Sequence, residues 1–118
     1  MQENWYFLEE LEATDSADIS AKVIVPADSP WFSGHFPDNP VLPAVAQLAI
    51  VFDVIELGSG RERVLKTIQR TKYRRIIRPA ESIRITASQT DEQGLRYAFQ
   101  MRVDNETACK GTLQMKNP

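Results

Sequence analysis

The chain contains a single histidine, His35, within a segment that glycine and proline keep out of regular secondary structure. Residues 27–43 read ADSPWFSGHFPDNPVLP, with four prolines and an Asp-Asn turn pair, which is typical of an ordered loop. An imidazole titrates near neutral pH, so a histidine held by such a loop can serve as a general base. A lone loop histidine is also commonly structural, and the residue type alone leaves both roles open.

A helix is predicted to begin where this loop ends. Pro43 suits the first turn of a helix, where its missing N–H costs nothing, and the next helix breakers are Gly58 and Gly60. The segment between them is apolar around most of its circumference, which predicts a buried central helix of about four turns. Backbone N–H groups near Ala44 and Val45, at its N-terminus, can polarise a carbonyl or bind an anion. A base beside such a donor is a more specific arrangement than the histidine alone.

The other segments predict strands joined by short turns. Alternating apolar and polar residues, or a long β-rich run, mark five segments as strands: 19–25, 64–78, 83–87, 95–103 and 109–115. Connections short enough for antiparallel neighbours lie at residues 79–81, 91–94 and 104–106. We therefore expect one α+β domain over residues 1–118, in which an antiparallel sheet wraps around one central helix.

Composition excludes several classes of protein. With 118 residues, 42% of them hydrophobic and 25% charged, the chain suits one globular domain and not a disordered tail. Its longest apolar stretch is interrupted by Gln47 and Asp53 and falls short of the roughly 20 residues of a membrane span. Cys109 has no partner for an internal disulfide, and one histidine cannot form a zinc cluster of the usual type. We expect a soluble cytoplasmic protein that needs no metal and no other cofactor.

Charge is distributed unevenly along the chain. Residues 1–60 carry ten acids and one base, Lys22, a balance of −9, whereas residues 61–118 carry thirteen bases and six acids, a balance of +7. Eight of these bases fall within residues 61–78 beside one acid, Glu62. Such a run suits either an acidic protein partner or the solvated face of a strand. We expect no nucleic-acid partner.

Two segments resemble those of one protein family. The stretch from Phe32 to Pro43, FSGHFPDNPVLP, resembles the active-site segment of the hotdog-fold 3-hydroxyacyl-acyl-carrier-protein dehydratases of fatty acid synthesis. The stretch from Lys72 to Glu81, KYRRIIRPAE, is similar to the family's lysine-aromatic-arginine-arginine segment, which ends in proline-glycine-aspartate. Together with the strand order on either side, the resemblance covers nearly the whole chain.

The resemblance implies a fold, a substrate and an assembly. The fold is the hotdog fold, and the substrate is an acyl thioester carried by acyl carrier protein or coenzyme A. Active sites of this family lie at a dimer interface, which implies a homodimer or a heterodimer with a homologous hotdog subunit. The segment PVLPAVAQL also resembles dehydratase-like proteins of aryl-polyene and related specialised lipid pathways.

The resemblance also assigns roles to individual residues. His35 takes the place of the family's catalytic base, which removes the proton at C2 of the thioester. Val41 matches a residue whose carbonyl faces the imidazole, and Ala44, in place of the usual glycine, matches the residue whose N–H binds the thioester carbonyl. Further substrate contacts are expected at Gly34 and Phe32, although an aromatic residue before a turn is also a common packing anchor. Contact with the acidic carrier is expected from four cations: Lys72, Arg74, Arg75 and Arg78.

One position departs from the family's pattern. Fourteen residues after the histidine the family has a Glu or Asp that protonates the departing 3-hydroxyl, and this chain has Ala49. At about 100° per residue, Asp53 and Glu56 lie on the same helix face as Ala49, whereas Gln47 lies on nearly the opposite side. Asp53 could reach the site through a water and act as the catalytic acid. Alternatively, both carboxylates are solvated or ion-paired residues near the helix end.

Three functions therefore stay open. The first is a dehydratase of 3-hydroxyacyl thioesters, with His35 as base and Asp53 in the place of the missing carboxylate. The second is a hotdog thioesterase, in which Asp53 or Glu56 activates a water. The third is a catalytically incomplete subunit that binds the carrier or pairs with a homologue that has the carboxylate.

Overall fold

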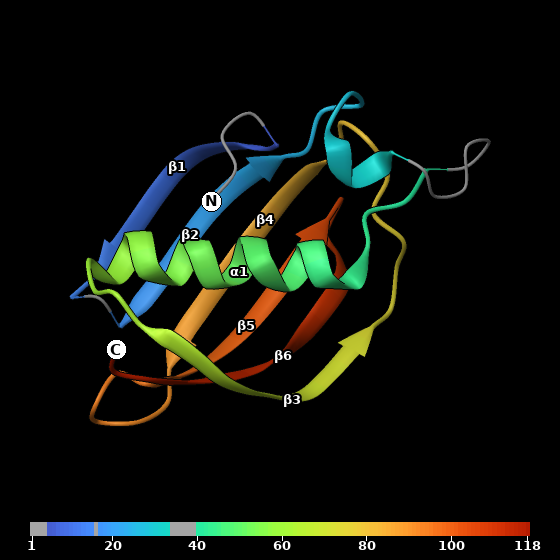
Figure 1. The fold of residues 1–118 in the computed structure, drawn as a ribbon. Helices are drawn as coiled ribbons and strands as arrows, with labels where there is room; N and C mark the ends of the chain where they lie inside the picture. Colours follow the sequence, from blue (N-terminus) through green and yellow to red (C-terminus); the bar gives the residue numbers. More distant parts are fainter. Residues whose placement is uncertain (1–4, 16, 34–39) are drawn as a thin grey trace.

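The strands of the chain form one continuous antiparallel sheet. The computed structural model describes residues 5–15, 17–33 and 40–118. Within these residues the elements are, in chain order, β1 (Phe7–Thr14), β2 (Asp18–Ile24), the short 3-10 helix η1 (Pro30–Phe32), α1 (Ala44–Ser59), β3 (Val64–Tyr73), β4 (Ser82–Gln89), β5 (Arg96–Val103) and β6 (Glu106–Lys116). The six strands of this described part are ordered β1-β2-β4-β5-β6-β3, with every neighbouring pair antiparallel (Figure 1). The predicted α+β architecture is confirmed.

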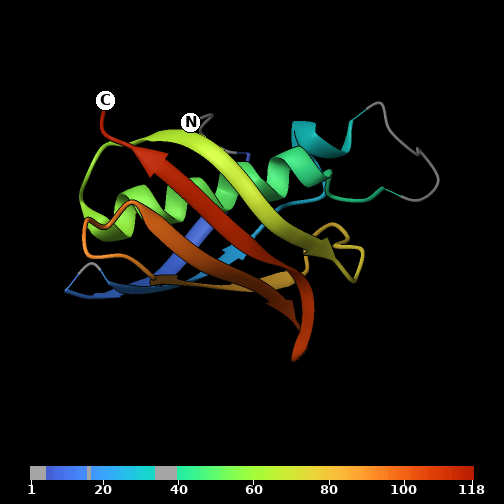
Figure 2. The same ribbon diagram turned by 90° about the horizontal axis from the view of Figure 1, so that it is seen from below.

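Helix α1 lies across the concave face of the sheet, which curves around it (Figure 2). The helix ends at Gly60, whose φ of 70° lies in the left-handed region that glycine adopts without strain. Its buried face is turned to the sheet and consists of Ala46, Gln47, Ile50, Val51, Val54, Ile55 and Ser59. No helix in the described ranges is long and apolar enough to cross a bilayer.

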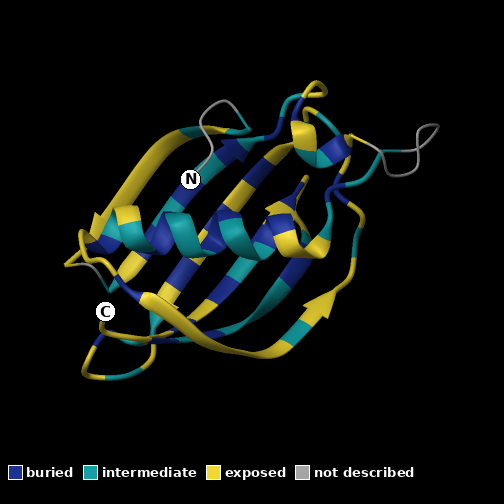
Figure 3. Ribbon diagram, viewed as in Figure 1, coloured by how far each residue is buried: buried dark blue, intermediate teal, exposed yellow. Residues whose placement is uncertain are grey.

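The prediction of a buried central helix is confirmed for the side of α1 that faces the sheet, whereas part of its apolar surface on the other side is exposed. Val45 is 73% exposed and Leu57 is 54% exposed. One curved sheet covers one side of a helix, so the apolar residues on the other side stay exposed or half-buried (Figure 3). The apolar character of that side is therefore not explained by the core of this chain.

The predicted alternation of the later strands is confirmed. In β5, Tyr97, Phe99 and Met101 are at most 4% exposed, and the residues between them point away from the core. In β4, Ile83 and Ile85 are fully buried in the same way. These side chains and the buried face of α1 make one hydrophobic core.

Two strands differ from the prediction. β1 lacks the alternation that marks a strand, because Leu8 alone among its residues is not exposed. β3 ends at Tyr73, short of the predicted end at Arg78. Arg74 and Arg75 both donate their backbone N–H to the carbonyl of Ala108, at 2.8 and 3.3 Å, and the chain then leaves the sheet as a loop.

β3 is an edge strand with apolar side chains in solvent. It pairs with β6 on one side, and no strand of the described chain pairs with its other side. Val64, Leu65, Ile68 and Tyr73 of β3 are between 37% and 46% exposed. An unpaired edge of this kind is suited to pairing with another chain.

Candidate functional site

A pocket of about 350 Å³ opens at the N-terminus of α1. One part of its lining comes from the end of the loop and the first turns of the helix: Val41, Leu42, Ala44 and Gln47. The other part comes from the end of β3 and the loop after it: Tyr73, Arg74, Arg75 and Ile76. The fold thus brings Val41 and Leu42, at the end of the first family-like segment, and the stretch from Tyr73 to Ile76, within the second, to one pocket.

Backbone hydrogen bonds hold the two sides of the pocket together. The N–H of Leu42 donates to the carbonyl of Ile77 at 2.8 Å, and both residues are buried. The N–H of Ala80 donates to the carbonyl of Val25 at 2.8 Å, which ties the same loop to the end of β2. The loop that follows the lining residues Tyr73 to Ile76 is therefore anchored at several points and does not depend on one contact.

The helix terminus presents backbone donors to this pocket. Ala46 and Gln47 both donate their N–H to the carbonyl of Pro43, at 3.1 Å each. Within the described residues no acceptor takes the N–H of Ala44 or Val45, and the first turn of α1 has no acidic side chain. A carbonyl oxygen placed at this terminus would meet N–H donors and the positive end of the helix dipole. The expected role of Ala44 as a carbonyl donor is compatible with this geometry.

Gln47 is a pocket residue that sequence reasoning missed. Its side chain is 4% exposed, and its Nε2 donates to the carbonyl of Leu42 at 3.1 Å. Its Oε1 is buried and has no hydrogen-bond partner in the described part of the chain. The sequence signal that could have pointed to it is a glutamine among the otherwise apolar residues from Ala44 to Phe52.

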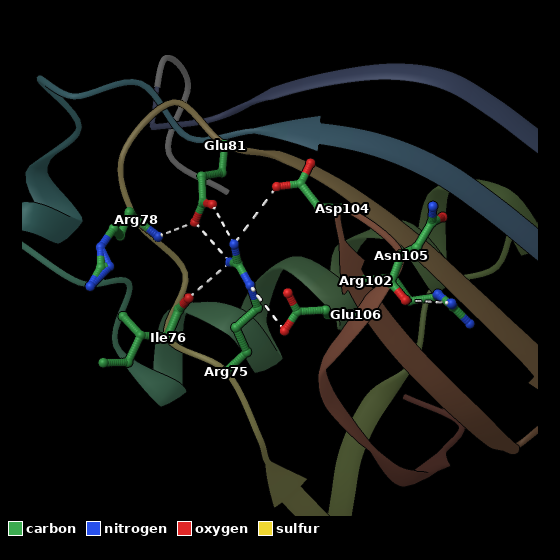
Figure 4. Close-up of polar contacts among 8 residues, drawn as sticks. All are labelled: Arg75, Ile76, Arg78, Glu81, Arg102, Asp104, Asn105 and Glu106. Atoms are coloured by element: carbon green, nitrogen blue, oxygen red, sulfur yellow. Dashed lines mark hydrogen bonds and ion pairs between the residues drawn. The ribbon is translucent and has the colours of Figure 1, made fainter.

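Arg75 is bound within the chain (Figure 4). Its Nη1 and Nη2 donate to the two carboxylate oxygens of Glu81 at 3.1 and 2.8 Å, and Nη1 also donates to the carbonyl of Ile76. Asp104 and Glu106 lie 3.8 Å from the same guanidinium. The hydrogen bonds from Arg75 are the main reason that the pKa of Glu81 lies below its ordinary value.

The other predicted carrier contacts are arranged differently. Lys72, Arg74 and Arg78 are exposed, and none of them forms an ion pair with another described residue. The backbone N–H of Arg78 donates to Glu81 at 2.7 Å, but its guanidinium points away from the Arg75 cluster (Figure 4). These three cations remain available to an acidic partner.

Asp53, the predicted acid, is held by an aromatic side chain outside the pocket. Its carboxylate accepts a hydrogen bond from the hydroxyl of Tyr6. Burial raises the pKa of Tyr6, and the hydrogen bond to Asp53 raises it further. Tyr6 in turn stacks on Trp31 with a ring distance of 6.0 Å. Asp53 therefore faces the N-terminal segment, and it is not among the residues that line the pocket.

No acid lines the pocket within the described chain. Ala49 is half-buried on α1 and has no proton to donate. Glu56 accepts the backbone N–H of Arg63 at 3.0 Å near the other end of the helix. Neither of the carboxylates considered for a thioesterase thus belongs to the pocket, and no group of residues in the described ranges could hold a metal ion.

Two of the remaining predicted site residues lie outside the part of the chain that the structure describes. His35 and Gly34 fall outside the described residues. Phe32 is 7% exposed, belongs to the hydrophobic core and does not line the pocket. Val41 and Ala44 do line it, so the structure brings two of the four expected substrate contacts together with Arg74 and Arg75.

Comparison with known proteins matches most of the chain to one family. Residues 10–112 match the ApeI-like family, described as the ApeI dehydratase. A 3-hydroxyacyl-[acyl-carrier-protein] dehydratase FabZ from Rickettsia conorii is 34% identical over 105 residues, covering 79% of this chain and 72% of the relative. The FabZ from Rickettsia bellii is 32% identical over 96 residues, covering 73% of this chain and 66% of the relative. The chain therefore spans about two thirds of the length of these curated relatives.

Solved structures confirm the hotdog fold. The dehydratase heterocomplex ApeI:P from Xenorhabdus doucetiae superposes with a TM-score of 0.84 at 22% identity, covering 94% of this chain and 97% of that one. An uncharacterized protein from Erwinia carotovora subsp. atroseptica gives a TM-score of 0.77 at 23% identity, covering 94% of this chain and 93% of that one. The family match over residues 10–112 and the 34% identity to FabZ show that the chain is related to these dehydratases in sequence as well as in fold. The chain belongs to the ApeI-like family of hotdog dehydratases.

Proposed function

We propose that this chain is a dehydratase subunit that removes water from 3-hydroxyacyl thioesters, with His35 as the general base. The observation that carries the proposal is the pocket in which Val41 and Ala44 meet the segment after β3. Both segments that resemble the dehydratases contribute to this one pocket. Family membership supports the reaction class, and the position of His35 in the sequence, six residues before the lining residue Val41, supports its role.

The proposed reaction has two steps, removal of a proton from C2 and loss of the 3-hydroxyl group as water. His35 takes the proton from C2, and the electron pair moves toward the thioester carbonyl, whose oxygen is stabilised by the N–H of Ala44. The C3–O bond then breaks, the C2–C3 double bond forms, and the leaving hydroxyl takes a proton to depart as water. The second step needs an acid, which the neutral Ala49 does not supply.

A second subunit is the better source of that acid. Asp53 is bonded to Tyr6 and lies outside the pocket, so it could take part within the chain only through an intervening water. The unpaired edge of β3, with its exposed apolar side chains, is suited to dimer formation. The ApeI:P structure is a dehydratase heterocomplex, which supports pairing with a second, different subunit. In our proposal that subunit has the carboxylate.

The substrate we propose is bound to an acyl carrier protein. The curated relatives are named as dehydratases of carrier-bound 3-hydroxyacyl groups. Arg74 lines the pocket, and Lys72 and Arg78 are exposed cations near it in the sequence. Carrier proteins are acidic partners suited to such cations. The family match is compatible with a place in aryl-polyene or related specialised lipid synthesis.

Installing the missing acid tests the proposal. The purified chain, with Ala49→Glu and the matched Ala49→Gln variant, would be incubated with a 3-hydroxyacyl carrier thioester and with its trans-2-enoyl product, and both directions followed by mass spectrometry. We expect Ala49→Glu to raise interconversion by about 100-fold over Ala49→Gln, and His35→Ala to abolish the gain. Loss of wild-type activity in Asp53→Asn would instead identify Asp53 as the acid. No gain from Ala49→Glu, with no dependence on His35 in any variant, would overturn the proposal.

A further inference from the structure

A second hollow lies on the outer face of the sheet, on the side away from α1. It has a volume of about 480 Å³ and spans β3, β6 and β5, with a lining that includes Arg70, Lys72, Ala98, Gln100, Lys110 and Thr112. Tyr97 and Met101 of β5 are buried against the core, so the side chains of Ala98 and Gln100 point outward. None of these six residues lines the pocket at the N-terminus of α1.

The charges of this hollow are all of one sign. Arg70, Lys72 and Lys110 are cations, and no acid belongs to its lining. None of the three forms an ion pair with any residue in the described ranges. Lys72 stands directly opposite Lys110 in the pairing of β3 with β6, and like charges at facing positions are destabilising. The arrangement is therefore unfavourable for the chain alone, and an anion between the cations would relieve it.

The backbone gathers these cations at a distortion of the sheet. The register of β3 against β6 shifts between Gln69 and Lys72, and Arg70 has a φ of 54°, in the left-handed region. A non-glycine residue in that region is uncommon, and a bulge in an edge strand re-aims side chains. Arg70, within the irregularity, and Lys72, at its end, both border the hollow. The small side chain of Ala98 leaves its floor open.

We propose that this hollow binds a phosphate group. A phosphate offers several acceptor oxygens to two ammonium groups and a guanidinium at once, and Gln100 and Thr112 add polar donors. The volume exceeds that of an isolated phosphate and is typical of a small-molecule site. Coenzyme A and the phosphopantetheine arm of a carrier protein both join a phosphate to the thiol that carries an acyl group as a thioester. The inference goes beyond the proposed function, since binding at this face requires neither His35 nor turnover.

Calorimetric titration of the purified chain with four compounds tests the site. The compounds are coenzyme A, phosphopantetheine, pantetheine without phosphate, and inorganic phosphate as a competitor. The test variant is Arg70→Gln/Lys110→Gln. The matched control is Lys66→Gln, which removes an exposed cation of β3 that does not line the hollow. The melting temperature of each variant is measured first to verify folding.

We expect the double variant to bind coenzyme A at least tenfold more weakly than the wild type, and Lys66→Gln to change its affinity less than twofold. Equal affinities for phosphopantetheine and coenzyme A would assign the hollow to the phosphate of the arm. Tighter binding of coenzyme A would assign it to the nucleotide phosphates. Equal binding by wild type and double variant, or an equal loss in Lys66→Gln, would overturn the proposal. Because no turnover is measured, such a failure leaves the dehydratase proposal untouched.

Discussion

Glu81 binds the guanidinium of Arg75 through both of its carboxylate oxygens, at 3.1 and 2.8 Å. The same carboxylate accepts the backbone N–H of Arg78 at 2.7 Å, so it closes the loop that forms one wall of the pocket. The pair explains why the segment from Lys72 to Glu81 contains adjacent arginines and ends in an acid. Arg74 is exposed and lines the pocket, whereas Arg75 folds back to hold the loop.

Loss of this carboxylate should destabilise the chain in a pH-dependent manner. The pKa of Glu81 is lowered from 4.5 in the folded chain, chiefly by the hydrogen bonds from Arg75, so the pair stabilises the fold above that pH. This stabilisation is lost as the pH falls below 4.5 and then through the lower pKa that Glu81 has in the folded chain. Urea unfolding should show Glu81→Gln to be less stable than the wild type by about 1 kcal/mol near neutral pH, with the difference shrinking in acid.

Glu92→Gln is the control for this measurement, because Glu92 is an exposed acid in a turn and has no ion pair with a described residue. It should leave the free energy of unfolding nearly unchanged at every pH. A difference between wild type and Glu81→Gln that stays constant from neutral to acidic pH would contradict a role for the ionised carboxylate.

The two neighbouring arginines should give opposite phenotypes. In a complex with a carboxylate-bearing subunit, Arg74→Gln should raise the KM for a carrier-bound substrate several-fold without changing stability, because Arg74 is exposed and unpaired within the described chain. Arg75→Gln should lower the free energy of unfolding by about 1 kcal/mol. Steady-state kinetics at two salt concentrations, beside urea unfolding, separates the effects, because salt screens only the exposed contact. The reverse assignment of the two phenotypes would show that Arg75 is the carrier contact.

Tyr6 and Asp53 should be coupled in stability. The hydroxyl of Tyr6 donates to Asp53 across 47 positions of sequence and ties the N-terminal segment to α1. A double-mutant cycle with Tyr6→Phe and Asp53→Asn should give a coupling of about 1–2 kcal/mol. If Asp53 is structural, both variants should retain the same turnover in a complex with a carboxylate-bearing subunit. Turnover lost in Asp53→Asn and kept in Tyr6→Phe would point to a catalytic Asp53.

Cys109 should be unreactive while the chain is folded. It is buried, and burial raises the pKa of its thiol from 9.0 to about 11. Iodoacetamide at about pH 8 should label it at least tenfold more slowly in buffer than in denaturant, as measured by mass spectrometry. The stability contributed by the protonated thiol is complete below pH 9.0 and decreases as the pH rises toward about 11. Rapid labelling of the native protein would contradict its burial.

The fold was predictable from local patterns, whereas the site required contacts between distant segments. Pro43 and Gly60 bound α1 as their backbone preferences predict, and the alternation in β5 identifies its buried face. Arg75 is different, because its acidic partners at positions 81, 104 and 106 come from two separate turns. A charge run alone could not distinguish this bound arginine from the exposed Arg74.

For Gln47 and Asp53 on α1, too, the sequence could not predict which residue belongs to the pocket. Helical spacing correctly separates the faces on which the two residues lie, but it does not tell which face borders the pocket. That depends on the loop after β3, which packs over the N-terminus of α1 through the bond between Leu42 and Ile77. The hydrogen bond that holds Asp53 comes from Tyr6, directly before β1, the strand whose sequence has no clear strand pattern.

The most direct test of the central claim is hydrogen exchange at C2 of a 3-hydroxyacyl carrier thioester in deuterated water, followed by mass spectrometry. If His35 is the base and the chain lacks its own acid, the purified wild type should incorporate deuterium at C2 with little net loss of water. His35→Ala should abolish the exchange, and a carboxylate-bearing subunit should convert exchange into dehydration. Absence of exchange in the wild type, or exchange that survives His35→Ala, would contradict the proposed function.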